Sequence, residues 1–192
     1  MYNQNMSNEL RSNALIILEK WELLDFLNKY GKAYLVGSVE LDLMTWRDID
    51  IEIIATETPT KEKSMEIASF LFNFDGVRKV TPIDYRSVTH PKKPKGLYIG
   101  GEYIDEEKES WKIDIWYLTP DSANSFEKTK NIKSRLDDAN KKIIKEIKKE
   151  VHDHPLYRKE IGSVDIYEAV LDNNIHDLEG FRKHLENKGI LL

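Results

Sequence analysis

Acidic residues alternate with isoleucines in the segment 48–52, which reads Asp-Ile-Asp-Ile-Glu. Successive side chains of a strand point to opposite faces, so Asp48, Asp50 and Glu52 share one face of this segment. Neighbouring carboxylates on such a face lie roughly 6–7 Å apart and repel one another unless a cation lies between them. Oxygen ligands of this kind suit a hard divalent cation such as Mg²⁺. The segment therefore predicts a magnesium-type site that handles phosphates.

A Gly-Ser pair, Gly37 and Ser38, precedes the acidic segment and follows the short apolar run 33–36. Glycine lets the backbone approach a phosphate closely, and the serine and the following amides can hydrogen-bond phosphate oxygens. A further acid, Asp114, lies between isoleucines in the alternating segment 111–118. Aspartate is disfavoured in strands. Aspartates in two strand-like segments that follow a Gly-Ser turn in the sequence therefore indicate a functional site.

Four other features are interpreted separately. Glu52 is expected to be a solvated strand residue or the partner of a nearby lysine, and Arg47 is expected to form a structural ion pair. The lysine-rich run 141–149 alternates with glutamates and is typical of a solvated helix face. Trp116 shares the face of Asp114, which makes it the best candidate for stacking on a base or ring.

Apolar periodicity and capping residues predict the secondary structure. Helices are expected over residues 8–30, 39–44, 60–73, 120–152, 163–173 and 177–187. Strands are expected over residues 33–36, 47–55, 77–88, 95–104 and 111–118. Thr119 and Pro120 form a preferred helix start, a cap followed by proline at the first helical position. The chain is thus expected to divide into a catalytic domain, residues 1–119, and an all-helical C-terminal region, residues 120–192, packed on it.

The composition limits which binding partners and which cellular compartment are expected. The 192 residues are 40% hydrophobic and 33% charged, which suits a folded core under a well-solvated surface. The net charge of −5 argues against long nucleic acid as a partner, because such partners favour basic surfaces. Without cysteine there is no disulfide, and we expect a cytoplasmic protein. No apolar run approaches the roughly 20 residues that span a membrane, and the oligomeric state stays open.

The succession of an apolar strand, Gly-Ser, Asp-x-Asp on a strand and a later strand aspartate resembles the nucleotidyltransferase superfamily. That superfamily includes DNA polymerase beta, poly(A) polymerases and antibiotic nucleotidyltransferases. The resemblance covers about residues 33–118 and implies an α+β fold, a mixed β-sheet flanked by helices. It also implies a set of site residues. These are Gly37 and Ser38 for nucleotide binding, and Asp48, Asp50 and Asp114 as catalytic residues that bind Mg²⁺ or Mn²⁺.

The resemblance implies an enzyme that transfers a nucleoside monophosphate from an NTP, such as ATP, to a hydroxyl acceptor and releases pyrophosphate. A small molecule is the expected acceptor. The alternative is a nucleotide-binding or protein-interaction module with this fold, for example one member of a toxin–antitoxin pair. A metal-dependent phosphatase or nuclease is a weaker alternative, because such sites commonly add histidines and none lies near these acids in the sequence. Neither the preferred NTP nor the acceptor follows from the sequence.

Overall fold

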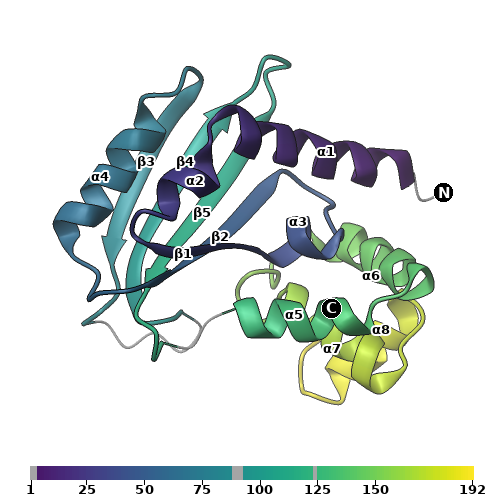
Figure 1. Ribbon diagram of the computed structural model, residues 1–192. Coiled ribbons are helices and arrows are strands. Elements are labelled where there is room, and N and C mark those ends of the chain that lie inside the picture. The colour runs from purple at the N-terminus through teal and green to yellow at the C-terminus, as the bar shows by residue number, and fades with distance from the viewer. Residues whose placement is uncertain (1–3, 88–92, 123–124) are drawn as a thin grey trace.

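A computed structural model describes residues 4–87, 93–122 and 125–192 of the chain (Figure 1). The strands are β1 (Gly31–Val36), β2 (Asp48–Ala55), β3 (Val77–Asp84), β4 (Gly96–Ile104) and β5 (Ser110–Leu118). The helices are α1 (Gln4–Lys20), α2 (Leu23–Leu27), α3 (Gly37–Leu41), α4 (Lys61–Phe72), α5 (Phe126–Arg135), α6 (Asp138–Val151), α7 (Ser163–Asn173) and α8 (Leu178–Glu186). Among the described residues, no helix is both long and apolar enough to cross a bilayer.

The five strands form one mixed sheet in the order β1-β2-β5-β4-β3. Strands β2 and β5 run parallel, and the other neighbours run antiparallel. One face of the sheet is apolar and buried, because alternate residues such as Ile49, Ile51, Ile113 and Ile115 all point to it. Helices α1, α2 and α4 contribute to the same core, so they cover this face. The α+β fold with a mixed sheet and flanking helices is confirmed.

A second hydrophobic cluster holds the C-terminal helices together. It is built from α6, α7 and α8, and it includes Leu41 and Leu43 from the segment that precedes β2. In Figure 1 the helices α5 to α8 gather beside α3, at the β1–β2 side of the sheet. The C-terminal region is helical throughout its regular elements, as expected. The division into residues 1–119 and 120–192 stays a prediction, since Leu41 and Leu43 pack on the helical side.

The expected helix over residues 8–30 is wrong in its length and continuity. Helix α1 begins earlier, at Gln4, and a separate α2 follows after a break at Glu22. Glu22 has a left-handed backbone with φ 47°, which interrupts the helical path. The apolar periodicity continues across the break, because Trp21, Leu23 and Leu27 are all buried. A periodic pattern therefore hid the interruption.

The expected helix over residues 120–152 is also wrong, since it forms two helices that start later. Residues 119–122 form a turn in which the Ser122 N–H donates to the Thr119 carbonyl at 3.0 Å. Residues 123–124 lie outside the described residues. Leu136 is extended (ψ 130°), and the Asp137 carboxylate then caps α6 by accepting from the Asn140 N–H at 2.7 Å.

The expected strand over residues 77–88 ends at Asp84 instead. Asp84 accepts hydrogen bonds from the backbone N–H, Nε and Nη2 of Arg86 at 3.0, 2.9 and 2.7 Å, which holds the chain in a tight local turn. Residue 88 lies outside the described residues. The ion pair expected of Arg47 is present, because its Nη1 lies 3.3 Å from Glu109 Oε2.

The lysine run on α6 is not a uniformly solvated face. Lys145 and Lys148 are 3% and 0% exposed. The Lys148 Nζ donates to the Leu43 carbonyl at 2.7 Å and lies 4.4 Å from the centre of the Trp46 ring. Lys145 Nζ lies 3.4 Å from a carboxylate oxygen of Asp42. These lysines tie α6 to the segment that leads into β2.

We expect the stability difference between the wild-type chain and a Lys148→Met variant to depend on pH. Burial lowers the pKa of Lys148 from 10.5 to about 7, opposed by Asp50 and Asp48 and reinforced by Lys145. Between pH 7 and pH 10 the unfolded chain therefore binds more protons at this position than the folded chain. The wild type should gain stability relative to the variant over that range, because methionine does not titrate.

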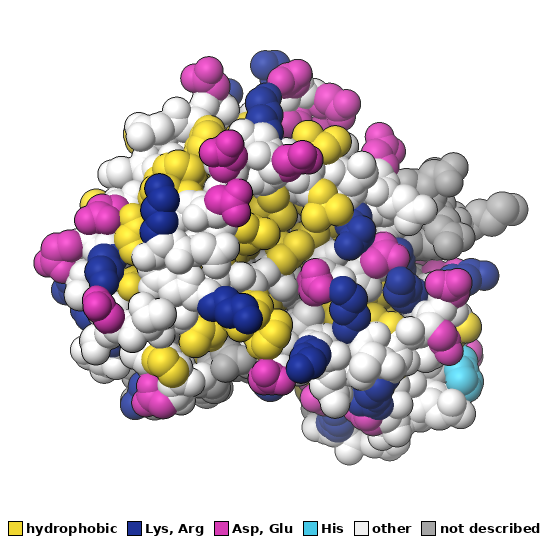
Figure 2. Space-filling view, viewed as in Figure 1, with side chains coloured by type: hydrophobic (Ala, Val, Ile, Leu, Met, Phe, Trp, Pro, Cys, Tyr) yellow, Lys and Arg dark blue, Asp and Glu magenta, His cyan; other side chains and the backbone are white. Residues whose placement is uncertain are grey.

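Urea unfolding at several pH values from 7 to 10 measures this difference. Lys142→Met is the matched control, because Lys142 is an exposed residue of the same helix. Figure 2 shows acidic and basic side chains interspersed over the viewed face of the molecule. A pH-independent difference for Lys148→Met would contradict the prediction.

Candidate active site

The parallel pairing of β2 and β5 brings the predicted acids together. Asp50 lies directly opposite Asp114 in the register, and Asp48 lies opposite Lys112. One carboxylate oxygen from each of Asp48, Asp50 and Asp114 lies within 4.8 Å of the others. These three form the only such group of potential metal ligands within the described part of the chain, and no histidine belongs to it. Two separate strands thus supply one acidic cluster.

The Gly-Ser pair lies against this cluster. Strand β1 ends at Val36, and Gly37 opens the short helix α3 with a positive φ of 64°. A Cβ atom at Gly37 would lie 2.7 Å from Asp50 Oδ2, so glycine is what allows the turn to approach the carboxylate. The Gly37 N–H donates to Thr129 Oγ1 of α5 at 3.4 Å, and Ser38 is buried.

We expect Gly37→Ala to lower the free energy of unfolding by about 1–2 kcal/mol, the usual cost of a left-handed backbone at a residue with a Cβ. The new methyl group would also push on the Asp50 carboxylate, which should weaken metal-dependent nucleotide binding. Urea denaturation measures the first effect. Gly162→Ala is the control, because Gly162 has a negative φ and the nearest atom to an added Cβ is 3.9 Å away. Equal losses in both variants would contradict the prediction.

Burial and mutual repulsion shape the electrostatics of the acids. Burial raises the pKa of Asp50 well above its usual range, and the neighbouring Asp48 and Asp114 raise it further. Burial also raises the pKa of Asp48, although the nearby Lys112 acts in the opposite direction. Three carboxylates this close together repel one another, and a bound cation would offset their charge.

Two cationic side chains lie against the cluster. Lys112 Nζ lies 3.7 Å from Asp48 Oδ1 and donates to Asp114 Oδ2. Arg158 Nη2, from the C-terminal region, lies 3.8 Å from Asp48 Oδ2. Burial alone would lower the pKa of Lys112, but Asp48 and Asp114 outweigh it and raise that pKa.

The acids fit a divalent metal. Asp48 Oδ1 is buried and accepts no hydrogen bond from the described residues. Such an oxygen has lost its water without gaining a donor, which is costly unless a cation replaces both. Three carboxylates within one coordination sphere are also the donor set that Mg²⁺ and Mn²⁺ prefer. Asp48, Asp50 and Asp114 are therefore the residues that could hold the metal.

Aromatic residues flank the acids on both sides. The Tyr98 hydroxyl donates to Asp114 Oδ1 at 2.7 Å, and burial, then this bond, raise the pKa of Tyr98. Trp46 donates from Nε1 to Asp48 Oδ2 at 3.4 Å and stacks on His152 with ring centres 4.6 Å apart. Trp116 shares the acidic face, as the alternation predicts, and its ring lies 5.1 Å from that of Tyr98.

Contrary to the expectation, Glu52 is not a solvated residue, and no lysine among the described residues is its partner. It is 1% exposed, and its carboxylate accepts from the Ser125 N–H at 2.7 Å and the Phe126 N–H at 3.0 Å. These amides belong to the first turn of α5, where a negative charge is favourable. Glu52 thus anchors α5 to the sheet, and α5 carries the Thr129 that contacts Gly37.

A cleft of about 350 Å³ lies over the β1–β2 side of the acids. The acidic face of β2 and the Gly-Ser turn form one wall, and helices α5 and α7 form the other. Its lining includes Ser38, Asp50, Lys128, Thr129 and Tyr167. The cleft has the size of a small-molecule site and lies between two parts of the fold, where ligands commonly bind.

The sequence interpretation missed several neighbours of the acids. Lys112 follows the same alternation as Asp114, so its place on the acidic face was visible in the pattern. No sequence pattern indicated that Tyr98 and Arg158 contact the acids, because they reach them from β4 and from the loop before α7. All five predicted residues, in contrast, lie at one place: Gly37, Ser38, Asp48, Asp50 and Asp114.

Comparison with solved structures places this geometry among known folds. The chain superimposes on a cytoplasmic RNA terminal U-transferase with TM-score 0.58 and 14% identity, covering 87% of this chain and 48% of that one. It superimposes on a CdnE c-di-GMP synthase from Capnocytophaga granulosa with TM-score 0.56 and 16% identity, covering 86% of this chain and 60% of that one. The chain has the nucleotidyltransferase fold.

The nucleotidyltransferase fold is also found in E. coli MS115-1 CdnC, solved with ATP, which matches with TM-score 0.54 and 12% identity. That match covers 97% of this chain and 68% of CdnC. The chain spans about half the length of the terminal U-transferase. No protein-family model matches the sequence, and neither does any curated protein. The fold is therefore established by structure alone.

Proposed function

We propose that this chain is a metal-dependent nucleotidyltransferase that moves a nucleoside monophosphate from an NTP to a hydroxyl acceptor. The observation that carries the proposal is the convergence of Asp48, Asp50 and Asp114 within 4.8 Å, beside the Gly37 turn. The fold it shares with nucleotidyltransferases supports the reaction class. Three partly buried acids this close together cost stability unless a cation offsets their charge, which supports a metal-binding role.

The residues have separate roles in this proposal. Bound Mg²⁺ or Mn²⁺ would neutralise charge on the triphosphate and on the leaving group, with Asp48, Asp50 and Asp114 as its ligands. Ser38 and the Gly-Ser turn bind phosphate oxygens in the cleft. Lys128, which lines the same cleft on α5, supplies positive charge to the triphosphate.

The reaction is an in-line displacement at the α-phosphorus. The acceptor oxygen forms a bond to the α-phosphorus, and the bond from that phosphorus to the oxygen bridging to the β-phosphorus breaks. Pyrophosphate leaves with the electron pair. The proton of the acceptor hydroxyl passes to the Asp114 carboxylate, which the Tyr98 hydroxyl orients at 2.7 Å, and from there to water.

We propose to test a broader class of acceptors than the sequence suggested. Net charge argued against long nucleic acid, yet one protein with this fold is an RNA terminal U-transferase and another is a c-di-GMP synthase. We therefore include nucleotides and RNA ends among the acceptors to be tested, together with small hydroxyl compounds. ATP is the first NTP to test, since CdnC was solved with ATP.

Metal-dependent NTP binding is the first experimental test. Thermal unfolding of the purified chain is recorded with each NTP, with Mg²⁺, Mn²⁺ or EDTA. At 100 times its dissociation constant, a bound NTP should stabilise the fold by about 2.7 kcal/mol. Transfer itself is then followed with α-labelled NTP and pyrophosphate release. Absence of metal-dependent stabilisation with every NTP would contradict the proposal and favour a protein-interaction module.

A further inference from the structure

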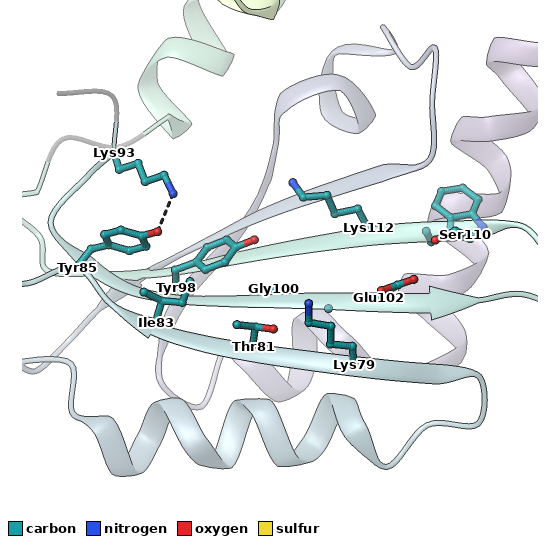
Figure 3. Close-up of a pocket in the computed structure, with 12 residues that line it drawn as sticks. Lys79, Thr81, Ile83, Tyr85, Lys93, Tyr98, Gly100, Glu102, Ser110 and Lys112 are labelled. Atoms are coloured by element: carbon teal, nitrogen blue, oxygen red, sulfur yellow. Dashed lines mark hydrogen bonds between the residues drawn. The ribbon is translucent and has the colours of Figure 1, made fainter. Parts of the chain in front are cut away.

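A second hollow lies on the other side of the acids from the nucleotide cleft. It is a groove of about 490 Å³ over the face of β3, β4 and β5 that the helices α1 and α4 do not cover (Figure 3). Its floor consists of side chains that alternate with the buried core residues on these strands. These groove residues are Lys79, Thr81, Ile83, Tyr98, Gly100 and Lys112. We call this hollow the sheet groove.

The sheet groove is continuous with the acidic cluster. Gly100 of β4 lies directly opposite Asp114 of β5, and Tyr98 lies opposite Trp116. The Tyr98 hydroxyl, which lines the groove, donates to Asp114 Oδ1. Lys112 lines the groove as well, and it contacts both Asp48 and Asp114. A compound in the groove could therefore present a hydroxyl to Asp114 from the side opposite to the nucleotide cleft.

Gly100 keeps the groove open beside Asp114. A Cβ atom at this position would lie 2.5 Å from the Tyr98 hydroxyl oxygen, so any side chain would displace Tyr98 or fill the groove. The volume of the groove is in the range of small-molecule sites. Space and access to Asp114 thus coincide at one place.

One end of the groove is aromatic and also holds Lys93, whose Nζ donates to the Tyr85 hydroxyl at 2.7 Å and lies 4.5 Å from the centre of the Tyr85 ring. Tyr85, Tyr98 and Ile83 gather at this end in Figure 3, and Ile83 is 37% exposed although it is apolar. The other end carries the lysines Lys79 and Lys112 beside Glu102. Ring-bearing compounds pack well on such aromatic surfaces.

The lining of the groove carries more lysines than acids although the chain is acidic overall, and one of these lysines, Lys112, is paired with Asp48 and Asp114. The lining contains three lysines, Lys79, Lys93 and Lys112, against the single glutamate Glu102, while the whole chain carries −5. Within the described part of the chain, Lys79 forms no ion pair, although Glu102 lies opposite it in the register of β3 and β4. Away from the acids, this lining disfavours a polycationic acceptor such as an aminoglycoside and favours an anionic one.

We propose that the sheet groove binds the acceptor, and that the acceptor is an anionic ring compound of the nucleotide class. Its ring packs on Ile83, Tyr85 and Tyr98, and its phosphate pairs with the lysines. The acceptor hydroxyl then lies at Asp114. This inference rests on the proposed transfer reaction for its catalytic meaning, but the binding it requires is independent of transfer.

Direct binding tests the groove without the reaction. AMP, a short single-stranded oligoribonucleotide and kanamycin are titrated in EDTA by calorimetry, so that metal-dependent binding in the nucleotide cleft is suppressed. Two variants disrupt the two ends of the groove, Lys79→Glu and Ile83→Asp. Lys142→Glu is the matched control, because Lys142 is an exposed lysine on α6. Circular dichroism and thermal unfolding confirm that each variant folds.

We expect the wild type and Lys142→Glu to bind AMP or the oligoribonucleotide more tightly than kanamycin. Each groove variant should weaken that binding about tenfold, which corresponds to about 1.4 kcal/mol. Tighter binding of the oligoribonucleotide than of AMP identifies an RNA end as the source of the nucleotide, and comparable binding identifies a free nucleotide. Preference for kanamycin, no binding of either nucleotide, or equal affinities in Lys79→Glu, Ile83→Asp and Lys142→Glu would overturn the inference.

The same variants separate this inference from the proposed function. Metal-dependent NTP stabilisation should be unchanged in Lys79→Glu and Ile83→Asp, since neither residue lines the nucleotide cleft. If the wild type does not bind NTP but still binds AMP in the groove, the proposed transfer function is wrong, and the groove remains a nucleotide-binding site. If the wild type binds NTP but Lys79→Glu and Ile83→Asp bind AMP as tightly as the wild type does, only the proposed role of the groove is wrong.

Discussion

The Asp50→Asn variant should lose nucleotidyl transfer by about 10³-fold or more, equivalent to about 4 kcal/mol of transition-state stabilisation. The substitution keeps the shape of the side chain but removes one of three carboxylates that converge within 4.8 Å. The same substitution should leave the melting temperature of the metal-free protein unchanged or raised. Burial and the neighbouring Asp48 and Asp114 raise the pKa of Asp50, so a neutral side chain relieves an unfavourable charge.

Transfer of α-label from NTP in the presence of Mg²⁺, together with thermal unfolding, tests both halves of this prediction. Asp75→Asn is the control, because Asp75 is an exposed aspartate near the start of β3. The opposite movement of activity and stability distinguishes a site residue from a structural one, since loss of a structural residue lowers both. An Asp50→Asn protein that transfers label as fast as the Asp75→Asn control would contradict the assignment.

The Glu52→Ala variant should have the largest effect on stability, a loss of about 2–4 kcal/mol in the free energy of unfolding. The buried Glu52 carboxylate accepts from the backbone N–H groups of Ser125 and Phe126. Alanine leaves these donors without their acceptor and removes a negative charge from the first turn of α5. Because α5 also places Thr129 against Gly37, NTP binding should weaken as well.

Urea denaturation of three variants separates the contributions. Glu52→Gln retains one acceptor oxygen without the charge and should lose less stability than Glu52→Ala. Glu146→Ala, at an exposed glutamate of α6, should change stability by less than about 0.5 kcal/mol. If Glu52→Ala were as stable as Glu146→Ala, the proposed anchoring of α5 would be wrong.

Local sequence patterns determined the strands and the face on which the acids lie. Strand side chains alternate with a period of two, so the isoleucines around Asp48, Asp50 and Asp114 fixed the buried face and, with it, the acidic face. These features depend on neighbouring residues, which is why they could be read without a structure.

Helix boundaries were less accessible, because periodicity persists across breaks. Trp21 and Leu23 are both buried on either side of Glu22, so the pattern suggested one helix where there are two. At Leu136 the backbone extends and Asp137 starts a new helix, although apolar residues continue at helical spacing. Packing against the rest of the fold decides between one helix and two, and a one-dimensional pattern does not contain that packing.

The sequence by itself determined which residues could do chemistry: the Gly-Ser pair Gly37 and Ser38, and Asp48, Asp50 and Asp114 on strands whose alternation places the acids on one face. Only the tertiary structure decided that β2 and β5 pair in parallel with Asp50 opposite Asp114. It also decided that Glu52 anchors a helix and that Lys148 is buried under Trp46. The physical reason is how far apart in the sequence the interacting residues lie. Alternation and turn conformation arise between neighbours in the chain, whereas strand register and burial arise between segments tens of residues apart.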